Sequence, residues 1–122
     1  MKLAPKATHH ISIFSSNVPA LVRFYTETLG LPITRRWDEL GIVFVDVGST
    51  TIELVPSPDR PPRPEAVNGF DHLALRVDDV DAACAALRDA GVTVERAPYD
   101  FQELRIAFVR DPDGNLLELV QE

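Results

Sequence analysis

The sequence predicts an α+β protein built from two paired βαβββ modules, which form a curved, partly open mixed β-sheet with the helices on the outer face. Two observations carry this prediction. A strand that contains a histidine and runs into a helix occurs twice, at 10–17 and at 70–79. The segments 52–55 (IELV) and 117–120 (LELV) then close the two halves with nearly the same pattern. A duplicated unit of about sixty residues follows from these two repeats.

The first module reads as one strand, one helix and three further strands. Alternating side chains predict the first strand over 8–14. Asn17 is suited to cap a helix that carries Pro19 in its first turn and ends at Gly30. Strands are then expected over 31–37, 41–47 and 50–55, with polar or glycine-containing turns between them.

The second module repeats this order. We expect a strand over 70–77, a helix over 80–90 between the cap Asp79 and Gly91, and a strand over 92–96. A loop holding Tyr99 and Phe101 is expected next, followed by strands over 104–110 and 115–120 with a turn at 111–114. Residues 56–69 contain five prolines and predict an extended linker. The whole of 1–122 is thus expected to be a single domain, with module one at 8–55 and module two at 70–120.

Composition excludes several classes of function. With 12 basic and 19 acidic residues the net charge is −7, which disfavours nucleic acid as a partner. No apolar run reaches the roughly twenty residues of a membrane span, and no signal peptide is evident, so we expect a cytoplasmic protein without membrane contact. The single cysteine, Cys84, falls on the apolar face of the second helix and is expected to be buried.

Side-chain alternation assigns two histidines and two glutamates to one face of the strands. In each strand the apolar neighbours occupy the opposite face, which the helices would cover. The four polar residues are His10, Glu53, His72 and Glu118. Two imidazoles and two carboxylates that converge suit a single divalent first-row metal ion such as Zn, Ni, Co, Mn or Fe(II). His9 is one residue out of phase and is left out of this set.

These features together resemble the vicinal oxygen chelate superfamily. The resemblance rests on the two βαβββ modules, the histidine in the opening strand of each, Leu29-Gly30-Leu31, and the closing DPDGN segment at 111–115 before Leu117-Glu118-Leu119. That superfamily includes glyoxalase I, methylmalonyl-CoA epimerase, extradiol dioxygenases, fosfomycin-resistance enzymes and metal-free bleomycin-resistance proteins.

The resemblance implies a glyoxalase I-like lyase or isomerase that binds neighbouring oxygens of a small 2-oxo or thiol-adduct substrate on the metal. The glyoxalase I ligand positions fall on the four residues above, and Glu118 is implied to be both ligand and base, with Glu53 as a second acid or base. Phe14 and Ser57 stand where glyoxalase I carries an arginine and an asparagine for glutathione. These departures favour another thiol adduct or another vicinal-oxygen substrate. A homodimer is also implied, as is one metal ion per site, with Ni, Zn or Co favoured and Fe or Mn as alternatives.

Further residues are candidates for substrate binding. Phe14 and Arg76 share the ligand face, and Arg105 lies on a neighbouring strand. The arginines would bind a substrate carboxylate, or else pair with the acidic surface. Trp37, Tyr99 and Phe101 would close the pocket, or else pack in the core or at a dimer contact.

Three other functions compete with the glyoxalase-type reaction. An acyl-thioester epimerase would need a second base, and an extradiol-type dioxygenase would need more open positions on the metal. A metal-free protein that binds a drug or other small ligand, like the bleomycin-resistance proteins, would leave the four potential ligands without a role. The modules are free to pair within one chain or between two chains.

Overall fold

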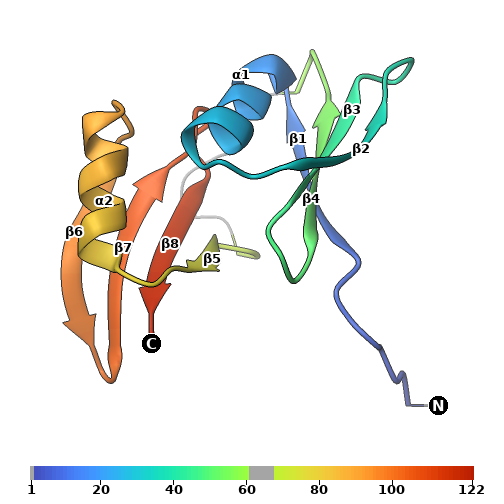
Figure 1. Cartoon of the computed structure of the whole chain (residues 1–122). Coiled ribbons are helices and arrows are strands. Elements are labelled where there is room, and N and C mark those ends of the chain that lie inside the picture. The colour runs from blue at the N-terminus through green and yellow to red at the C-terminus, as the bar shows by residue number, and fades with distance from the viewer. Residues whose placement is uncertain (1, 61–67) are drawn as a thin grey trace. The chain divides into compact units, whose positions relative to one another are not determined.

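A computed structural model describes residues 2–60 and 68–122 of the protein (Figure 1). The chain divides into two compact units, Met1–Pro61 and Pro62–Glu122, called here unit one and unit two. Each unit has one four-stranded mixed sheet and the element order βαβββ, so the predicted α+β class and module composition are confirmed. Half of the predicted linker, residues 61–67 of 56–69, lies outside the described residues.

Unit one follows the predicted order closely. Its sheet has the strand order β1-β4-β3-β2, in which β1 and β4 are parallel and the other pairs are antiparallel. The bounds are β1 His10–Ser15, α1 Val18–Arg23, a π-helical turn Phe24–Thr28, β2 Ile33–Trp37, β3 Ile42–Asp46 and β4 Thr51–Pro56.

Unit two has the same topology, with the strand order β5-β8-β7-β6 and a parallel β5–β8 pair. Helix α2 packs across β6, β7 and β8 (Figure 1). The bounds are β5 His72–Arg76, α2 Val80–Asp89, β6 Val94–Phe101, β7 Leu104–Arg110 and β8 Leu116–Gln121.

The predicted helix caps are confirmed in both units. The side chains of Asn17 and Asp79 accept hydrogen bonds from the backbone N–H groups of Ala20 and Ala82, at 3.2 and 3.0 Å. Each helical segment ends before a glycine with positive φ, Gly30 at 77° and Gly91 at 85°. These caps satisfy backbone groups that the helix itself leaves unpaired.

The π-helical turn in unit one accommodates an extra residue. Between the cap and the closing glycine, unit one has one residue more than unit two. In unit two the Val92 N–H donates to the Leu87 carbonyl, whereas in unit one Leu31 N–H reaches one residue further back, to Tyr25. Such turns absorb single insertions within helices. The extra residue therefore leaves the strands that follow in the same places in the two units.

The core of each unit lies between the helix and one face of the sheet. The apolar neighbours of the two strand glutamates are buried there, with exposed fractions from 0 to 3 %: Ile52, Leu54, Leu117 and Leu119. Cys84 is also buried, as predicted. The opposite face of each sheet carries the glutamates and is only partly covered.

The predicted loop around Tyr99 and Phe101 was wrong, because β6 continues to Phe101. Pro98 favoured a loop in the sequence, since proline cannot donate a hydrogen bond to a neighbouring strand. Strand β6 lies at the edge of its sheet, and its register with β7 shifts between Arg96 and Tyr99. This bulge accommodates Pro98 without ending the strand.

Within the residues that the structure describes, no helix is both long enough and apolar enough to cross a membrane.

Candidate functional site

Unit one brings His10 and Glu53 together. His10 begins β1 and Glu53 lies in the adjacent, parallel β4, where it is in register with Ser12. The His10 Nε2 atom lies 3.7 Å from Glu53 Oε1, and the Ser12 hydroxyl donates to the same oxygen at 2.5 Å. The imidazole is 36 % exposed and the carboxylate 15 %. A partly covered His–Glu pair thus stands on the face away from α1.

Unit two repeats this pair with His72 and Glu118. The strands β5 and β8 are parallel, and Glu118 is in register with Ala74. The His72 Nε2 atom lies 3.1 Å from Glu118 Oε2. The exposed fractions, 34 % and 14 %, nearly equal those in unit one. Ala74 replaces Ser12, so the glutamate of unit two lacks the hydroxyl donor that its counterpart has.

The Nδ1 atom of each histidine is engaged on the side away from the glutamate. His72 Nδ1 lies 2.8 Å from Asp71 Oδ2, and His10 Nδ1 lies 2.8 Å from His9 Nδ1. A carboxylate on one ring nitrogen fixes the orientation of an imidazole and leaves the other nitrogen available as a ligand. His9, which strand alternation left out of the set of four, thus contacts His10 at the ring nitrogen that is not turned toward Glu53.

Each glutamate belongs to a row of side chains that crosses its sheet on the same face. In unit one the register places Glu53 beside Phe44 on β3, and Phe44 beside Arg35 on β2. In unit two it places Glu118 beside Phe108 on β7, and Phe108 beside Arg96 on β6. We call these the Glu53 row and the Glu118 row.

The rings in these rows contact the histidines edge to face. Ring centroids are 5.7 Å apart for His10 and Phe44, and 5.5 Å apart for His72 and Phe108. Sequence analysis missed both phenylalanines and both row arginines. Each phenylalanine and arginine of unit one has a counterpart of the same type in unit two. These counterparts can be matched only once the register between the strands is known.

Most predicted substrate-binding residues lie on the same face as the His–Glu pairs. Trp37 packs edge to face on Phe44, at 5.3 Å between ring centroids, and is 38 % exposed. In unit two, Tyr99 is in register with Ile106 on this face, and Phe101 lies two positions further along β6. Phe14 and Arg76 follow their histidines along β1 and β5, each four residues on.

Arg105 was predicted to bind substrate, but it lies on the opposite face of the sheet from Glu118. It is in register with Gln121, whose side chain accepts a hydrogen bond from the Val80 N–H at the start of α2. Its guanidinium forms two hydrogen bonds with Asp81, at 2.9 and 3.0 Å, and one with Asp100 at 3.2 Å. The hydrogen bond from Arg105 lowers the pKa of the Asp81 carboxyl, and the pKa of Arg105 is raised in return. Arg105 thus ties the helix to the sheet.

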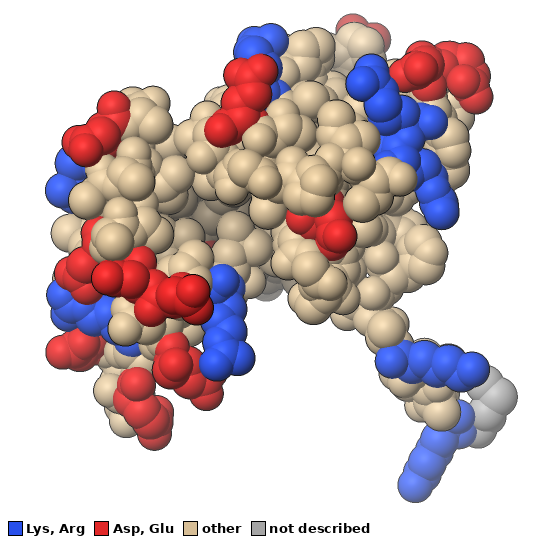
Figure 2. All heavy atoms as spheres, viewed as in Figure 1, with Lys and Arg blue, Asp and Glu red and all other residues tan. Residues whose placement is uncertain are grey.

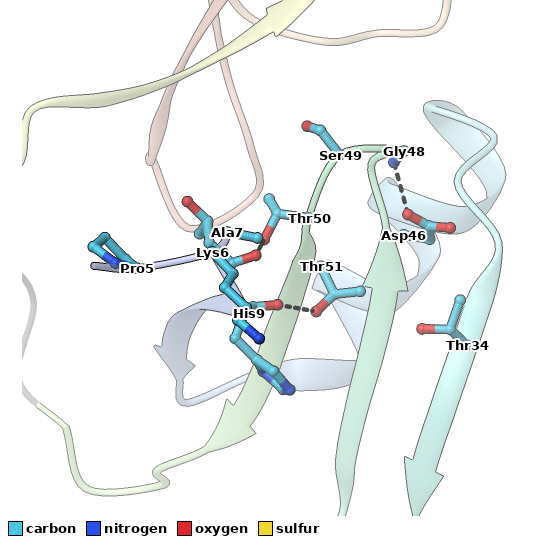
Figure 3. A pocket seen from close by; sticks show the side chains of 11 residues that line it. Pro5, Lys6, Ala7, His9, Thr34, Asp46, Gly48, Ser49, Thr50 and Thr51 are labelled. Atoms are coloured by element: carbon cyan, nitrogen blue, oxygen red, sulfur yellow. Dashed lines mark hydrogen bonds between the residues drawn. The ribbon is translucent and has the colours of Figure 1, made fainter. Parts of the chain in front are cut away.

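A cavity of about 510 Å³ in unit one is lined in part by His9, the residue before His10 (Figure 3). It is formed where residues 5–9 pass the end of β3 and the start of β4. Thr51, one of its lining residues, is in register with His10 on the neighbouring strand. The Thr51 hydroxyl donates to the His9 carbonyl at 3.2 Å, and Asp46 accepts from the Gly48 N–H at 2.7 Å (Figure 3). Neither His10 nor Glu53 is among its lining residues, so the cavity does not lie over the His–Glu pair.

The donors present fit a divalent metal, taken pair by pair. Each pair supplies one imidazole nitrogen and one carboxylate, the donor types that Zn, Ni, Co, Mn and Fe(II) accept. Among residues 2–60 and 68–122, no group of three or more His, Cys, Asp or Glu side chains comes together for a metal. Each unit therefore carries two donors, half of a four-donor set.

Fold and site together define a duplicated βαβββ protein with one His–Glu pair in each copy. The model of the Glyoxalase/Bleomycin resistance protein/Dioxygenase superfamily matches residues 7–119. The chain belongs to this superfamily, as the sequence resemblance predicted.

Relatives within the superfamily differ in what their names say. The chain is 36 % identical to the Escherichia coli K12 protein YaeR, over 98 % of this chain and 99 % of YaeR. It is 33 % identical to a probable lactoylglutathione lyase of Vibrio parahaemolyticus, over 92 % of this chain and 88 % of the lyase. It is also 33 % identical to TnmS3, an antibiotic binding protein of Streptomyces sp. CB03234, with a TM-score of 0.78 and 98 % of each chain covered. The chain is equally identical to a probable lyase and to a binding protein, so overall identity does not decide between these two functions. The residues of the site have to decide.

Proposed function

We propose that the protein is a metal-dependent lyase or isomerase of the glyoxalase type, which moves a proton between adjacent carbons of a small vicinal-oxygen substrate. The observation that carries the proposal is the repetition of one His–Glu pair, with nitrogen–oxygen distances of 3.7 and 3.1 Å, at equivalent places in both units. A pair with no shared role would be free to diverge in one copy.

The two pairs would hold one divalent ion between them, within one chain or across two chains. The donors are His10, Glu53, His72 and Glu118. When bound, such an ion acts as a Lewis acid on neighbouring substrate oxygens and lowers the barrier for removing a proton from the adjacent carbon.

Glu118 is the proposed base. Its carboxylate would take the proton from the carbon next to the carbonyl and return it to the neighbouring carbon. Glu53 would be less free to do so, because the Ser12 hydroxyl already donates to its Oε1. Phe44 and Phe108 flank the two pairs and would exclude water from the reacting carbons.

A homodimer belongs to the same proposal. The edge strands β1 and β2 of unit one, and β5 and β6 of unit two, each pair with one neighbour only within their sheets. A symmetric dimer would cover such edges and is a common solution for small sheets. Sedimentation velocity should give twice the mass of one chain.

Metal analysis tests the proposal directly. The protein is stripped with a chelator, reloaded with Ni(II), Co(II) or Zn(II), and assayed with methylglyoxal mixed with glutathione or with other thiols. We expect about one ion for each set of four donors, and turnover only after loading. Glu118→Gln should keep the metal and lose turnover, while Glu103→Gln, an exposed glutamate of the same unit, should keep both.

A metal-free ligand-binding protein is the second candidate, favoured by the likeness to TnmS3. It predicts no retained metal after reloading, together with saturable binding of an apolar drug-sized ligand. Full turnover by Glu118→Gln with its metal in place would sink the base assignment alone. Absence of any metal after reloading would sink the enzymatic proposal as a whole.

A further inference from the structure

Six arginines lie in the two sheets, and among the residues that the structure describes the two row arginines and Arg76 lack a carboxylate partner, whereas the other three have one. Arg36, Arg105 and Arg110 each have a carboxylate partner, at 3.1, 2.9 and 3.3 Å. Arg35 and Arg96 have none among the residues that the structure describes. Both are exposed, in a chain with 19 acidic residues to 12 basic ones. Their missing partners are therefore not a matter of acid supply.

Aromatic rings hold both guanidinium groups. The Arg35 guanidinium carbon lies 5.8 Å from the centre of the Trp37 ring and 5.5 Å from that of Phe44. The Arg96 guanidinium carbon lies 3.7 Å from the centre of the Tyr99 ring. An aromatic ring interacts with the face of a guanidinium and leaves the N–H groups at its edge free to donate. Each group is thus oriented, and its N–H groups make no hydrogen bond to another side chain within residues 2–60 and 68–122.

The position of these arginines relative to the glutamates is the same in the two units. Along the Glu53 row, Arg35 lies two strands from Glu53, and along the Glu118 row, Arg96 lies two strands from Glu118. Neighbouring strands are about 4.8 Å apart, so the backbone of each arginine lies about 10 Å from the backbone of its glutamate. Phe44 or Phe108 fills the space between. A molecule a few carbon atoms long spans that distance once the arginine side chain reaches inward.

We propose that Arg35 and Arg96 form oxyanion-binding subsites, which hold a carboxylate or phosphate group at the far end of the substrate. The inference deepens the proposed function and rests on it for the word substrate, since the reacting oxygens would lie at the His–Glu pairs. A guanidinium edge binds two oxygens of one planar anion through parallel hydrogen bonds. The substrate class is therefore a short, apolar-bodied acid with oxygens at both ends.

The subsites also account for two positions noted in the sequence. Phe14 stands where the resemblance to glyoxalase I implies an arginine for the glutathione carboxylate, and Ser57 stands where it implies an asparagine. The Phe14 ring here lies under the Arg60 guanidinium, 4.8 Å from its carbon atom. In this proposal the anion is instead bound at the edge strands β2 and β6, where Arg35 and Arg96 lie. A smaller anionic substrate than a tripeptide adduct fits this shift.

The test uses metal-free full-length protein, so that it does not depend on the metal chemistry. Succinate and inorganic phosphate are titrated separately at constant ionic strength, with chloride as the reference anion. Trp37, the one tryptophan of the sequence, reports binding near Arg35 by fluorescence, and calorimetry reports both subsites. We expect saturable binding of at least one probe, with chloride inert. A succinate response assigns a carboxylate, and a phosphate response assigns a phosphoryl group.

Variants locate the binding. Arg35→Gln with Arg96→Gln should weaken it at least tenfold, and the two lysine replacements, which keep charge but lose the fork, should fall between. Arg36→Gln is the matched control, because Arg36 is adjacent in β2 but faces the other way and pairs with Asp38. No saturable response to either probe, or a response that survives the double glutamine variant, would overturn the proposal. If the native protein binds the anion but shows no turnover after metal loading, the result would count against the proposed function alone.

Discussion

The two units share a topology and a His–Glu pair but differ in charge. Residues 1–61 contain six acidic and six basic side chains, whereas residues 62–122 contain thirteen acidic and six basic ones. Figure 2 shows acidic side chains gathered over unit two. The whole net charge of −7 therefore belongs to the second half. The rows through Glu53 and Glu118 nevertheless keep the same residue types, apart from Ser12 and Ala74.

This comparison separates positions held in common from positions free to vary. The glutamate, phenylalanine and arginine of each row, and the histidine paired with each glutamate, recur although the surrounding surface differs in charge between the units. The helices differ in length and cap residue, and only unit two has the Asp81–Arg105 contact between helix and strand. Shared chemistry should therefore respond equally to matched changes in the two units, and local structure should respond unequally.

Removing the histidines should have the largest effect. His10→Ala and His72→Ala are each expected to lower metal affinity and turnover more than about 100-fold, because residues that only support ligands already contribute about 10–100-fold. Metal content and kcat/KM measure this. Glu103→Gln, at an exposed position away from both pairs, is the control and should change neither quantity. A large loss in one unit only would break the equivalence of the two pairs.

Truncating the core leucines beside the glutamates should come second. Leu54 and Leu119 are 0 and 3 % exposed, and Leu→Ala at such sites costs about 2–5 kcal/mol of unfolding free energy. Urea unfolding should give similar losses for both. Leu40→Ala, at 57 % exposed, should change stability by less than about 0.5 kcal/mol. Costs as small as that for the buried leucines would contradict the assignment of the core face.

Exchanging the one unequal position should have a smaller effect. Ser12→Ala removes the donor to Glu53 and is expected to weaken Ni(II) binding about tenfold. Ala74→Ser places a hydroxyl beside Glu118, where it should slow turnover while leaving the metal bound. Competition with a metal-sensitive dye measures the affinity. Unchanged affinity in Ser12→Ala would show that the hydroxyl does not support the ligand.

Helix caps should contribute about 1 kcal/mol each. Asn17→Ala and Asp79→Ala both remove a side-chain acceptor at a helix start, and cap losses of this kind cost about 1 kcal/mol. Asn17→Ser and Asp79→Ser keep an acceptor and should recover most of it. Chemical denaturation followed by circular dichroism is the measurement. A serine variant as unstable as its alanine counterpart would rule out capping as the cause.

The Asp81–Arg105 contact should give the smallest effect and one that depends on pH. The pKa of folded Asp81 is below its ordinary value of 3.8, because Arg105 donates to the carboxylate. The contact therefore stabilises the protein above that value and is lost as the pH falls through the lower folded pKa. Asp81→Asn should be less stable than the native protein at pH 6, with the difference shrinking below about pH 4. Arg105→Gln, which removes the donor to the same carboxylate, should show the same convergence.

Much of the fold, and the placement of the His–Glu pairs on one face of each sheet, followed from local patterns in the sequence. Alternating apolar residues in β1, β4, β5 and β8 placed His10, Glu53, His72 and Glu118 away from the helices, and the structure pairs them within each unit as that alternation requires. Cap residues and glycines placed both helices. Whether the two pairs share one ion stays a prediction.

The tertiary structure decided what depends on register between strands. Leu104 to Val109 of β7 is apolar on both faces apart from Arg105, so alternation could not say which face Arg105 occupies; pairing with Gln121 assigned it to the helix side. Pro98 hid the continuation of β6, because its effect depends on whether the strand lies at an edge. The rows that reach Arg35 and Arg96 form only when distant segments align side by side, which no local pattern specifies.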